Sequence, residues 1–189
     1  GYLELLKDYD IPEDGERFLE KAMDANKSAS DLIEKVRKLR KVRNEEIDEI
    51  KVNSVINDAI SEFESQASEK DIEIDYDKCE CAVEGSSLLC ESFSNLVGNC
   101  VRHSNGDLIK IWAHREDDDV VITVEDDGKG ISDDVKDKIL EKGFKKGENA
   151  GSGLGMYLAK RISEACGGHI EVKDSELGGA RFDIHLKKA

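Results

Sequence analysis

Residues 125–131 follow directly on an apolar strand pattern and read Glu125-Asp126-Asp127-Gly128-Lys129-Gly130-Ile131. A carboxylate at the end of a strand, followed by Gly-x-Gly, offers a hydrogen-bond acceptor that no neighbouring side chain crowds. That geometry suits an exocyclic amine such as the amino group of adenine. Because Asp-Gly pairs are also common turn formers, the stretch alone leaves a plain turn open as the alternative.

A second polar cluster lies on the helix pattern that precedes this stretch, in the run Asn95-Leu96-Val97-Gly98-Asn99-Cys100-Val101-Arg102-His103-Ser104. Asn95 and Asn99 are four residues apart and therefore share one helix face, while the apolar residues between them turn to the core. Amide oxygens are hard, neutral ligands that suit magnesium. Arg102 and His103, one turn further on, can reach phosphate oxygens. Taken alone, such a polar stripe is more often an ordinary exposed helix face.

Glycines return in Gly151-Ser152-Gly153-Leu154-Gly155, a run that opens a helix. Bare backbone amides at a helix N-terminus favour negative charge, and glycines let phosphates come close. The run lacks the leading strand of a Rossmann turn and the Lys-Ser/Thr ending of a P-loop. Residues 142–149, which precede it, have the short, polar, glycine-bounded composition of a mobile lid over a ligand. This segment contains Phe144, Lys145 and Lys146; the two lysines can meet phosphates, although a solvated charge run is their default interpretation.

The surrounding sequence predicts an α+β fold in which a helical layer covers one mixed β-sheet. Alternating or apolar runs predict strands at residues 47–52, 71–76, 82–83, 108–114, 119–125, 169–172 and 180–186. Helical spacing predicts helices that start at an Asn53 N-cap, at Gly85 and Ser86, near residue 135 and near residue 154, the last ended by Gly167. Strands outnumber helices and run in adjacent pairs, which favours this layered arrangement.

Residues 1–45 have a different pattern from the rest and are predicted to form a helical hairpin, followed by a second domain over residues 46–189. An apolar seam repeats at spacings of four and three through Phe18, Ala22, Ala25, Ala29, Leu32, Val36 and Leu39. Pro12 and Gly15 interrupt the pattern before it, so residues 2–9 are expected to end an earlier helix. Pairing of two such hairpins into a four-helix bundle would bury the seam in a homodimer; packing of the helix on its own domain is the alternative.

Bulk composition excludes several classes of function. The net charge of -15 disfavours sequence-independent binding to nucleic acid and contact with anionic membranes, and 38% apolar residues suffice for a core. No stretch is long or apolar enough to cross a membrane. The odd number of cysteines predicts reduced, mostly buried thiols in a cytosolic protein. Cys79 and Cys81 are not expected to bind zinc, because no second ligand pair lies at suitable spacing.

The order of these motifs resembles the Bergerat-type ATPase superfamily and, within it, the sensor histidine kinases, over about residues 47–187. Residues 95–104 resemble their asparagine box, residues 126–131 and 151–155 their glycine boxes, Phe144 their phenylalanine box, and residues 178–182 their closing strand turn. The combination is highly specific, although each box alone is not.

The resemblance implies a site for ATP and Mg2+. Asn95 and Asn99 would be the catalytic side chains, with Asn99 coordinating the magnesium ion and Asn95 lining the phosphates and metal-bound water. Asp126 would bind the adenine amino group, with room provided by Gly128 and Gly130 and with Ile131 beside them. The phosphates would meet Arg102, His103, Lys145, Lys146, Gly151, Ser152, Gly153, Leu154 and Gly155. Cys100 stands where many relatives have alanine, and Lys145 and Lys146 stand where relatives often have hydroxyl residues.

The activity implied is transfer of the γ-phosphoryl group of ATP to a histidine and then to an aspartate on a response-regulator receiver domain. The family's phosphorylated histidine lies upstream of a stretch like Gly1 to Leu6, so this chain is not expected to phosphorylate itself. His103 is read as part of the nucleotide site, and His114, His169 and His185 as surface or strand residues. The expected setting is cytoplasmic, with no direct membrane contact by this segment.

Three other functions are compatible with parts of the pattern. Another Bergerat ATPase, such as a chaperone, a mismatch-repair protein or a topoisomerase subunit, would usually present glutamate where Asn95 stands. A serine kinase of the anti-sigma type is disfavoured by the N-terminal hairpin. A dimeric scaffold with an idle nucleotide site is disfavoured because every box is intact.

Overall fold

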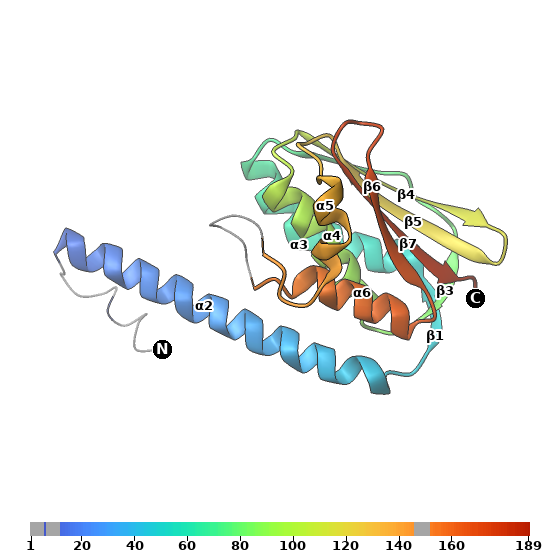
Figure 1. The fold of residues 1–189 in the computed structure, drawn as a ribbon, viewed down its shortest axis with the longest axis horizontal. Coiled ribbons are helices and arrows are strands. Elements are labelled where there is room, and N and C mark those ends of the chain that lie inside the picture. Colours follow the sequence, from blue (N-terminus) through green and yellow to red (C-terminus); the bar gives the residue numbers. More distant parts are fainter. Residues whose placement is uncertain (1–5, 7–11, 146–151) are drawn as a thin grey trace.

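The computed structural model describes Leu6, residues 12–145 and residues 152–189. Figure 1 shows a layered body, in which helices lie against one face of a β-sheet, and a long helix, α2 (Glu13–Lys41), which runs out from that body. The predicted α+β class, with helices on a mixed sheet, is confirmed. Of the helix expected within residues 2–9, only Leu6 is among the described residues.

The main sheet has five strands in the order β2-β4-β5-β7-β6. Their bounds are β2 Glu73–Tyr76, β4 Leu108–Glu116, β5 Asp119–Asp126, β6 His169–Asp174 and β7 Ala180–Lys187. Only the β2–β4 pair is parallel among these neighbours, and the other three pairs are antiparallel. A separate two-stranded sheet joins β1 (Asp48–Lys51) to β3 (Ala82–Gly85). The strand β5 lies in the centre and is buried along almost all of its length, so its last residue, Asp126, is held by strands on both sides.

Three helices cover one face of the five-stranded sheet: α3 (Val52–Glu69), α4 (Leu89–His103) and α6 (Gly155–Ala165). Short helical turns occupy Val42–Asn44 (η1), Asp133–Lys136 (α5) and Lys138–Leu140 (η2). The helices contribute fully buried side chains such as Phe93, Leu96 and Leu158, which meet Phe182 and Ile184 of the sheet in one apolar core. Burial on this scale stabilises by roughly 1.5–3 kcal/mol for each large apolar side chain. This core positions both ends of α4 firmly.

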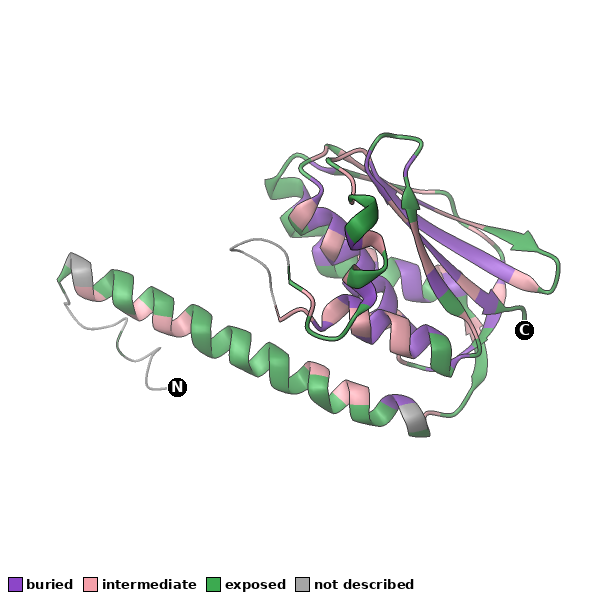
Figure 2. Cartoon of the chain, viewed as in Figure 1, coloured by how far each residue is buried: buried purple, intermediate pink, exposed green. Residues whose placement is uncertain are grey.

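The helix α2 contributes little to that core. Figure 2 shows it exposed along most of its length, with partly buried residues near both ends. Phe18 is 62% exposed and Ile33 is 55% exposed, whereas Leu39 and Val42, which follow, pack against the core. Lys38 of α2 forms an ion pair with Glu91 of α4. Of the predicted seam, Leu39 near the C-terminal end of α2 packs against the core of the domain.

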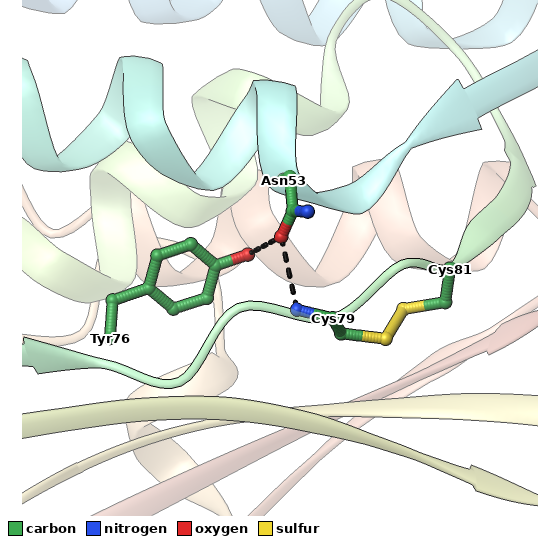
Figure 3. The surroundings of a disulfide bond; sticks show 4 residues. All are labelled: Asn53, Tyr76, Cys79 and Cys81. Atoms are coloured by element: carbon green, nitrogen blue, oxygen red, sulfur yellow. Dashed lines mark hydrogen bonds between the residues drawn. A yellow bond between two sulfur atoms is a disulfide. The ribbon is translucent and has the colours of Figure 1, made fainter.

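Two sequence predictions in the region before α4 are wrong. Asn53 is not the N-cap of α3, because the helix begins at Val52 after Lys51. Its Oδ1 instead accepts hydrogen bonds from the Tyr76 hydroxyl (2.5 Å) and the Cys79 amide (3.1 Å), as Figure 3 shows. An oxygen in the first turn can accept from a neighbouring segment as readily as from its own helix, and here it ties α3 to the segment that follows β2.

The prediction that the cysteines are all reduced is also wrong. Cys79 and Cys81 form a disulfide with a Cα–Cα separation of 5.4 Å (Figure 3). An extended chain would place the Cα atoms of residues 79 and 81 about 6.6 Å apart, so the chain bends here and brings the two thiols within disulfide range. Cys90, Cys100 and Cys166 are free, and the last two are buried.

Candidate nucleotide-binding site

Asn95 is buried on the face of α4 that meets the start of α6. Its Nδ2 donates a 2.7 Å hydrogen bond to the carbonyl oxygen of Glu91, one turn earlier. A β-carbon at Gly155 would lie 2.6 Å from Asn95 Oδ1 and 3.5 Å from Lys35 Nζ. The bonded amide nitrogen fixes the orientation of the side chain, so the oxygen faces the first turn of α6. Glycine at position 155 keeps the space beside that oxygen open.

Asp126 ends β5 as a buried carboxylate with 3% exposure. Its Oδ1 accepts hydrogen bonds from the backbone amides of Gly128 (3.0 Å) and Ala180 (3.3 Å). The Cys100 thiol also hydrogen-bonds to this carboxylate; burial, with the carboxylate's charge adding to it, raises the pKa of Cys100 well above its ordinary value. Cys100 therefore stays a neutral donor, and Asp126 is an acceptor whose orientation is set by three neighbours.

The glycine loop after Asp126 is attached to the end of α4. The amide of Lys129 donates to the carbonyl oxygen of Ser104 (2.9 Å), and a β-carbon at Gly128 would overlap that same oxygen. Gly130 has a φ of 67° and lies close to Gly179. Any larger residue at position 128 would force the loop away from α4. The two glycines thus permit the close approach that the sequence pattern predicts, and Ile131 packs against the apolar core behind the loop.

The second glycine run is contacted by the segment before it. Gly153 has a φ of 68°, and a β-carbon there would lie 2.6 Å from the carbonyl oxygen of Phe144. The amide of Gly143 donates to the carbonyl oxygen of Gly153 (3.1 Å), and Ser152 Oγ accepts from the amide of Leu154 (3.3 Å). The turn that leads into α6 and the Phe144 segment therefore support each other.

The structure describes only some of the other residues that were predicted to contribute to this region. Phe144 is half-buried and Lys145 is exposed. Lys146 and Gly151 lie outside the described residues, so their predicted contacts stay predictions.

Three cationic side chains gather near α4. The Arg102 guanidinium lies 5.4 Å from the centroid of the Phe63 ring. Burial lowers the pKa of Arg102, and burial followed by the charges of Arg102 and Lys129 lowers the pKa of His103. Burial, followed by the charge of Arg102, likewise lowers the pKa of Lys35. The positive charges of Lys35 and Arg102 oppose each other, and a bound anion would stabilise both.

Lys35 was missed by the sequence analysis, as were the Ser104 carbonyl and the contact of Gly179 with Asp126. Lys35 belongs to a run of charged residues on α2 that is indistinguishable in sequence from a solvated helix face. Only the packing of α2 on the domain brings it to Gly155. The Gly178-Gly179 pair did carry a signal, since it was recognised as a strand turn, but its approach to Asp126 depends on the β5–β7 pairing.

The predicted motifs therefore converge along one helix. The start of α6 meets α4 at Asn95, and the loop after Asp126 meets it at Ser104, nine residues on, or about 14 Å of helix. Asn99 lies between them and is partly exposed. That spacing is comparable with an extended nucleoside triphosphate. An acceptor suited to an amine stands at the Ser104 end, where Arg102 and His103 occupy the last turn of α4. Asn95, Lys35 and the glycine-rich start of α6 stand at the other end.

The amide oxygens fit a magnesium ion better than they fit a softer metal. Neutral oxygen donors that leave space for water are the environment that Mg2+ prefers. A β-carbon at Gly155 would clash with Asn95 Oδ1, so only glycine lets the start of α6 come this close to the amide oxygen. The residues present thus fit the group that the sequence predicts.

Comparison with known proteins agrees with this geometry. Residues 84–189 match the family described as histidine kinase-, DNA gyrase B- and HSP90-like ATPases. Because the match covers more than half of the chain, the chain belongs to this family, and the matched region is an ATP-binding domain of the histidine kinase type.

The individual relatives are sensor kinases. The heme sensor protein HssS of Staphylococcus saprophyticus is 28% identical over 193 residues, which cover 98% of this chain and 42% of that protein. The sensor-like histidine kinase SenX3 of Mycobacterium tuberculosis is 28% identical over 195 residues, which cover 96% of this chain and 47% of that protein. The chain therefore spans less than half of the length of these two relatives.

Two solved structures, one of them from a histidine kinase, share the fold. Full-length ShkA in complex with AMPPNP superposes with a TM-score of 0.80 at 21% identity, covering all of this chain and 42% of ShkA. The catalytic domain of the histidine kinase ThkA superposes with a TM-score of 0.67 at 26% identity, covering 76% of this chain and 96% of that domain. Because the superposition on ShkA covers all of this chain, the shared fold includes α2.

Proposed function

We propose that this chain is the catalytic part of a protein-histidine kinase, which transfers the γ-phosphoryl group of ATP to a histidine. The observation that carries the proposal is the arrangement along α4, where Asn95 faces the start of α6 and Ser104 holds the loop after Asp126. The acceptor histidine and the receiver aspartate of a response regulator belong to other segments or partners. Residues 1–45 would form part of the dimerisation hairpin and residues 46–189 the catalytic domain.

Each end of the site has its own role in this proposal. Asp126, whose Oδ1 is held by two backbone amides, would accept a hydrogen bond from the adenine amino group. Lys35, Arg102 and the amides at the start of α6 would neutralise phosphate charge. Phosphoryl transfer needs positioning and charge neutralisation more than covalent participation by the protein. The Phe144 segment, with Lys145, would exclude water, which otherwise competes as the acceptor.

A bound Mg2+ ion would supply charge neutralisation on the phosphate oxygens. Asn99 would coordinate it, and Asn95 would orient phosphate oxygens and water beside it. Asn95 also argues against rapid hydrolysis of ATP, because relatives that hydrolyse ATP in water often have a glutamate base at this position. An amide cannot take a proton from water as a carboxylate can, so slow hydrolysis is expected.

The partners proposed are a second copy of the chain through α2 and a receiver domain. Exposed apolar side chains along α2, including Phe18, Leu32, Ile33 and Val36, support the first. The described residues contain no helix that is both long and apolar enough to span a membrane. A cytoplasmic setting is part of the proposal, because response regulators are expected there.

The proposal is tested by titration calorimetry of the chain with a non-hydrolysable ATP analogue at several Mg2+ concentrations. Asn99→Ala should weaken Mg2+-dependent binding by about tenfold or more, because it removes a metal ligand. Asn95→Ala should weaken it less. Equal losses of affinity in the two variants would contradict the different roles proposed for Asn99 and Asn95. If the unaltered chain does not bind the analogue, the assignment as a kinase is wrong.

A second measurement addresses the acceptor. Incubation of this chain with labelled ATP and Mg2+ should leave no acid-labile phosphate on it, since none of its four histidines is proposed as the acceptor. Acid-labile label on His103, His114, His169 or His185 would contradict this part of the proposal. Steady ATP hydrolysis that Asn95→Ala leaves unchanged would instead favour an ATPase of the chaperone or topoisomerase type.

A further inference from the structure

The sheet face opposite the helices carries a cluster of two histidines and a glutamate. His169 on β6 and His185 on β7 are direct cross-strand partners, and Glu171 is two residues beyond His169 on the same strand. Side chains two residues apart on a strand, and those of cross-strand partners, share one face of a sheet. The neighbours Ile170 and Ile184 face the core instead. The cluster is therefore separate from the nucleotide site, which lies along α4.

The three side chains are close enough to share one ion. His185 Nε2 lies 3.5 Å from one carboxylate oxygen of Glu171, and His169 Nε2 lies 3.8 Å from the other. One ligand atom from each residue can be chosen so that all three lie within 4.8 Å of one another. In a tetrahedral site with metal–ligand bonds of about 2.1 Å, ligand atoms are about 3.4 Å apart. Small side-chain rotations of the stacked imidazoles, whose centroids are 4.3 Å apart, would reach that spacing.

One polar atom of the cluster points to a missing ligand. His185 Nε2 is buried and has no hydrogen-bond partner within the part of the chain that the structure describes. Buried side-chain nitrogens nearly always have a partner, and an exception indicates an ion or water that completes the site. Because this nitrogen lies beside Glu171 without forming a hydrogen bond to it, a cation between the two would satisfy both.

The charges around the cluster permit such a cation. Glu171 forms an ion pair with Lys173 at 2.5 Å. Lys173 also donates to Asp183 at 2.9 Å, and Asp183 is buried. If a cation displaced the ammonium group from Glu171, Lys173 would keep Asp183 as its partner. The metal would therefore not leave a lysine unpaired.

We propose that His169, Glu171 and His185 form a binding site for a divalent transition-metal ion of the zinc class. Two imidazoles and one carboxylate are a ligand set that Zn2+ uses when it keeps a fourth position for water. Imidazole selects zinc-class ions over magnesium, which prefers oxygen. His169 is 55% exposed and Glu171 is 42% exposed, so an ion can enter from solvent. The site would clamp the edge strand β6 to β7.

The proposal is tested by titrating Zn2+ into the chain against a chromophoric chelator, without reductant so that the Cys79–Cys81 disulfide stays closed. One zinc ion should bind per chain. His169→Gln and His185→Gln should each weaken binding by more than about tenfold, because loss of even an outer-shell partner of a metal ligand weakens binding by about 10–100-fold. The matched control is His114→Gln, which removes an exposed histidine from β4, two strands away from β7 across the sheet. It should leave the affinity unchanged.

Substitution of Co2+ for Zn2+ distinguishes this site from the free thiols of Cys90, Cys100 and Cys166. A spectrum with ligand-field bands and no thiolate charge-transfer band supports the histidine–carboxylate site. A thiolate band, or equal Zn2+ affinity in the unaltered chain and both histidine variants, would overturn the proposal. Because His169 is exposed, its glutamine variant should remain folded, and Glu171→Gln provides a further variant that should also weaken binding.

Discussion

The nucleotide-binding domain buries its large apolar side chains, whereas α2 leaves several of its own exposed. In the domain, Phe182 and Leu158 are fully buried within one core shared by the helices and the sheet. On α2, Phe18 and Ile33 are more than half exposed. Burial of apolar area is the main stabilising contribution to a fold, so the domain contains its own stabilisation whereas α2 depends on what it packs against. Within the described residues, α2 meets the domain near its C-terminal end, through Lys35, Lys38 and Leu39.

Because of this difference, the two ends of the candidate site depend on different parts of the chain. In the proposed orientation of the nucleotide, the adenine end would be built by the domain, from Asp126, its loop and Cys100. The phosphate end would include Lys35 from α2, whose Nζ lies 3.5 Å from the position of a β-carbon at Gly155. A movement of α2 relative to the domain would therefore alter the phosphate end and leave the adenine end unchanged. The following predictions test that separation, beginning with the largest expected effect.

Phe182→Ala should lower the free energy of unfolding of the domain by about 3–5 kcal/mol, because it removes a fully buried aromatic side chain and leaves a cavity. The matched control is Phe18→Ala on α2, where the same change removes a largely exposed ring and should alter the unfolding of the domain by less than about 0.5 kcal/mol. Denaturant unfolding of dilute protein measures both. Similar losses in the two variants would mean that α2 and the domain form one cooperative unit.

Asp126→Asn should weaken binding of every adenine nucleotide by about 10–100-fold, corresponding to about 1–3 kcal/mol for a lost buried hydrogen bond. The substituted amide can keep its oxygen toward the amides of Gly128 and Ala180, but its nitrogen cannot accept from adenine. Titration calorimetry with ATP, ADP and adenosine measures the effect.

The neighbouring Asp127 provides the control for this experiment. Its Oδ1 accepts from the backbone amides of Asp107 and Leu108 and has a structural role. Asp127→Asn should therefore leave affinity within about twofold, because an amide oxygen can accept the same bonds. A loss limited to ATP in Asp126→Asn would place the residue at the phosphate end and contradict the proposed orientation of the nucleotide.

The sequence predicted most of the domain because its patterns are local. Strand alternation, the stripe of α4 and the glycine runs each depend on residues within one element, and the structure places these elements within a few residues of the predicted bounds. Asn53 was misassigned because the same side chain can cap a helix or bond to a distant segment, and only the position of Tyr76 decides between them. The Cys79–Cys81 disulfide was missed because residue spacing does not determine redox state.

The site was less predictable where it depends on packing between distant segments. The roles proposed for Asn95, Asn99 and Asp126 come from the resemblance in motif order and stay predictions, while the structure brings their motifs to one helix. Lys35 could not be identified, because its position beside Gly155 requires the last turns of α2 to dock on α4 and α6. The histidines of β6 and β7 were read as ordinary strand residues, because their pairing depends on a register that the sequence does not specify.

Lys35→Met should weaken binding of an ATP analogue by about fivefold, or about 1 kcal/mol, and should leave binding of adenosine unchanged. Methionine keeps the length and apolar stem of the side chain, so the change removes mainly the charge near Gly155. Lys27→Met, on an exposed part of α2 two turns earlier, is the control. If both variants bind ATP as the unaltered chain does, α2 does not contribute to the phosphate end.

Leu32→Asp should have the smallest effect on the domain and yet change the assembly. Leu32 lies in the apolar seam, is 41% exposed in the single chain and is three residues from Lys35. A carboxylate buried between two helices is strongly unfavourable, so dimer dissociation should become easier by about tenfold or more, which light scattering measures. The free energy of unfolding of the domain should change by less than about 0.5 kcal/mol, because the residue does not enter its core.

Lys27→Asp introduces the same carboxylate on the opposite face of α2 and should leave the dimer intact. If Leu32→Asp instead destabilised the domain while the chain was monomeric throughout, the seam would pack on its own domain, and the contrast between a self-sufficient domain and a dependent helix would be wrong.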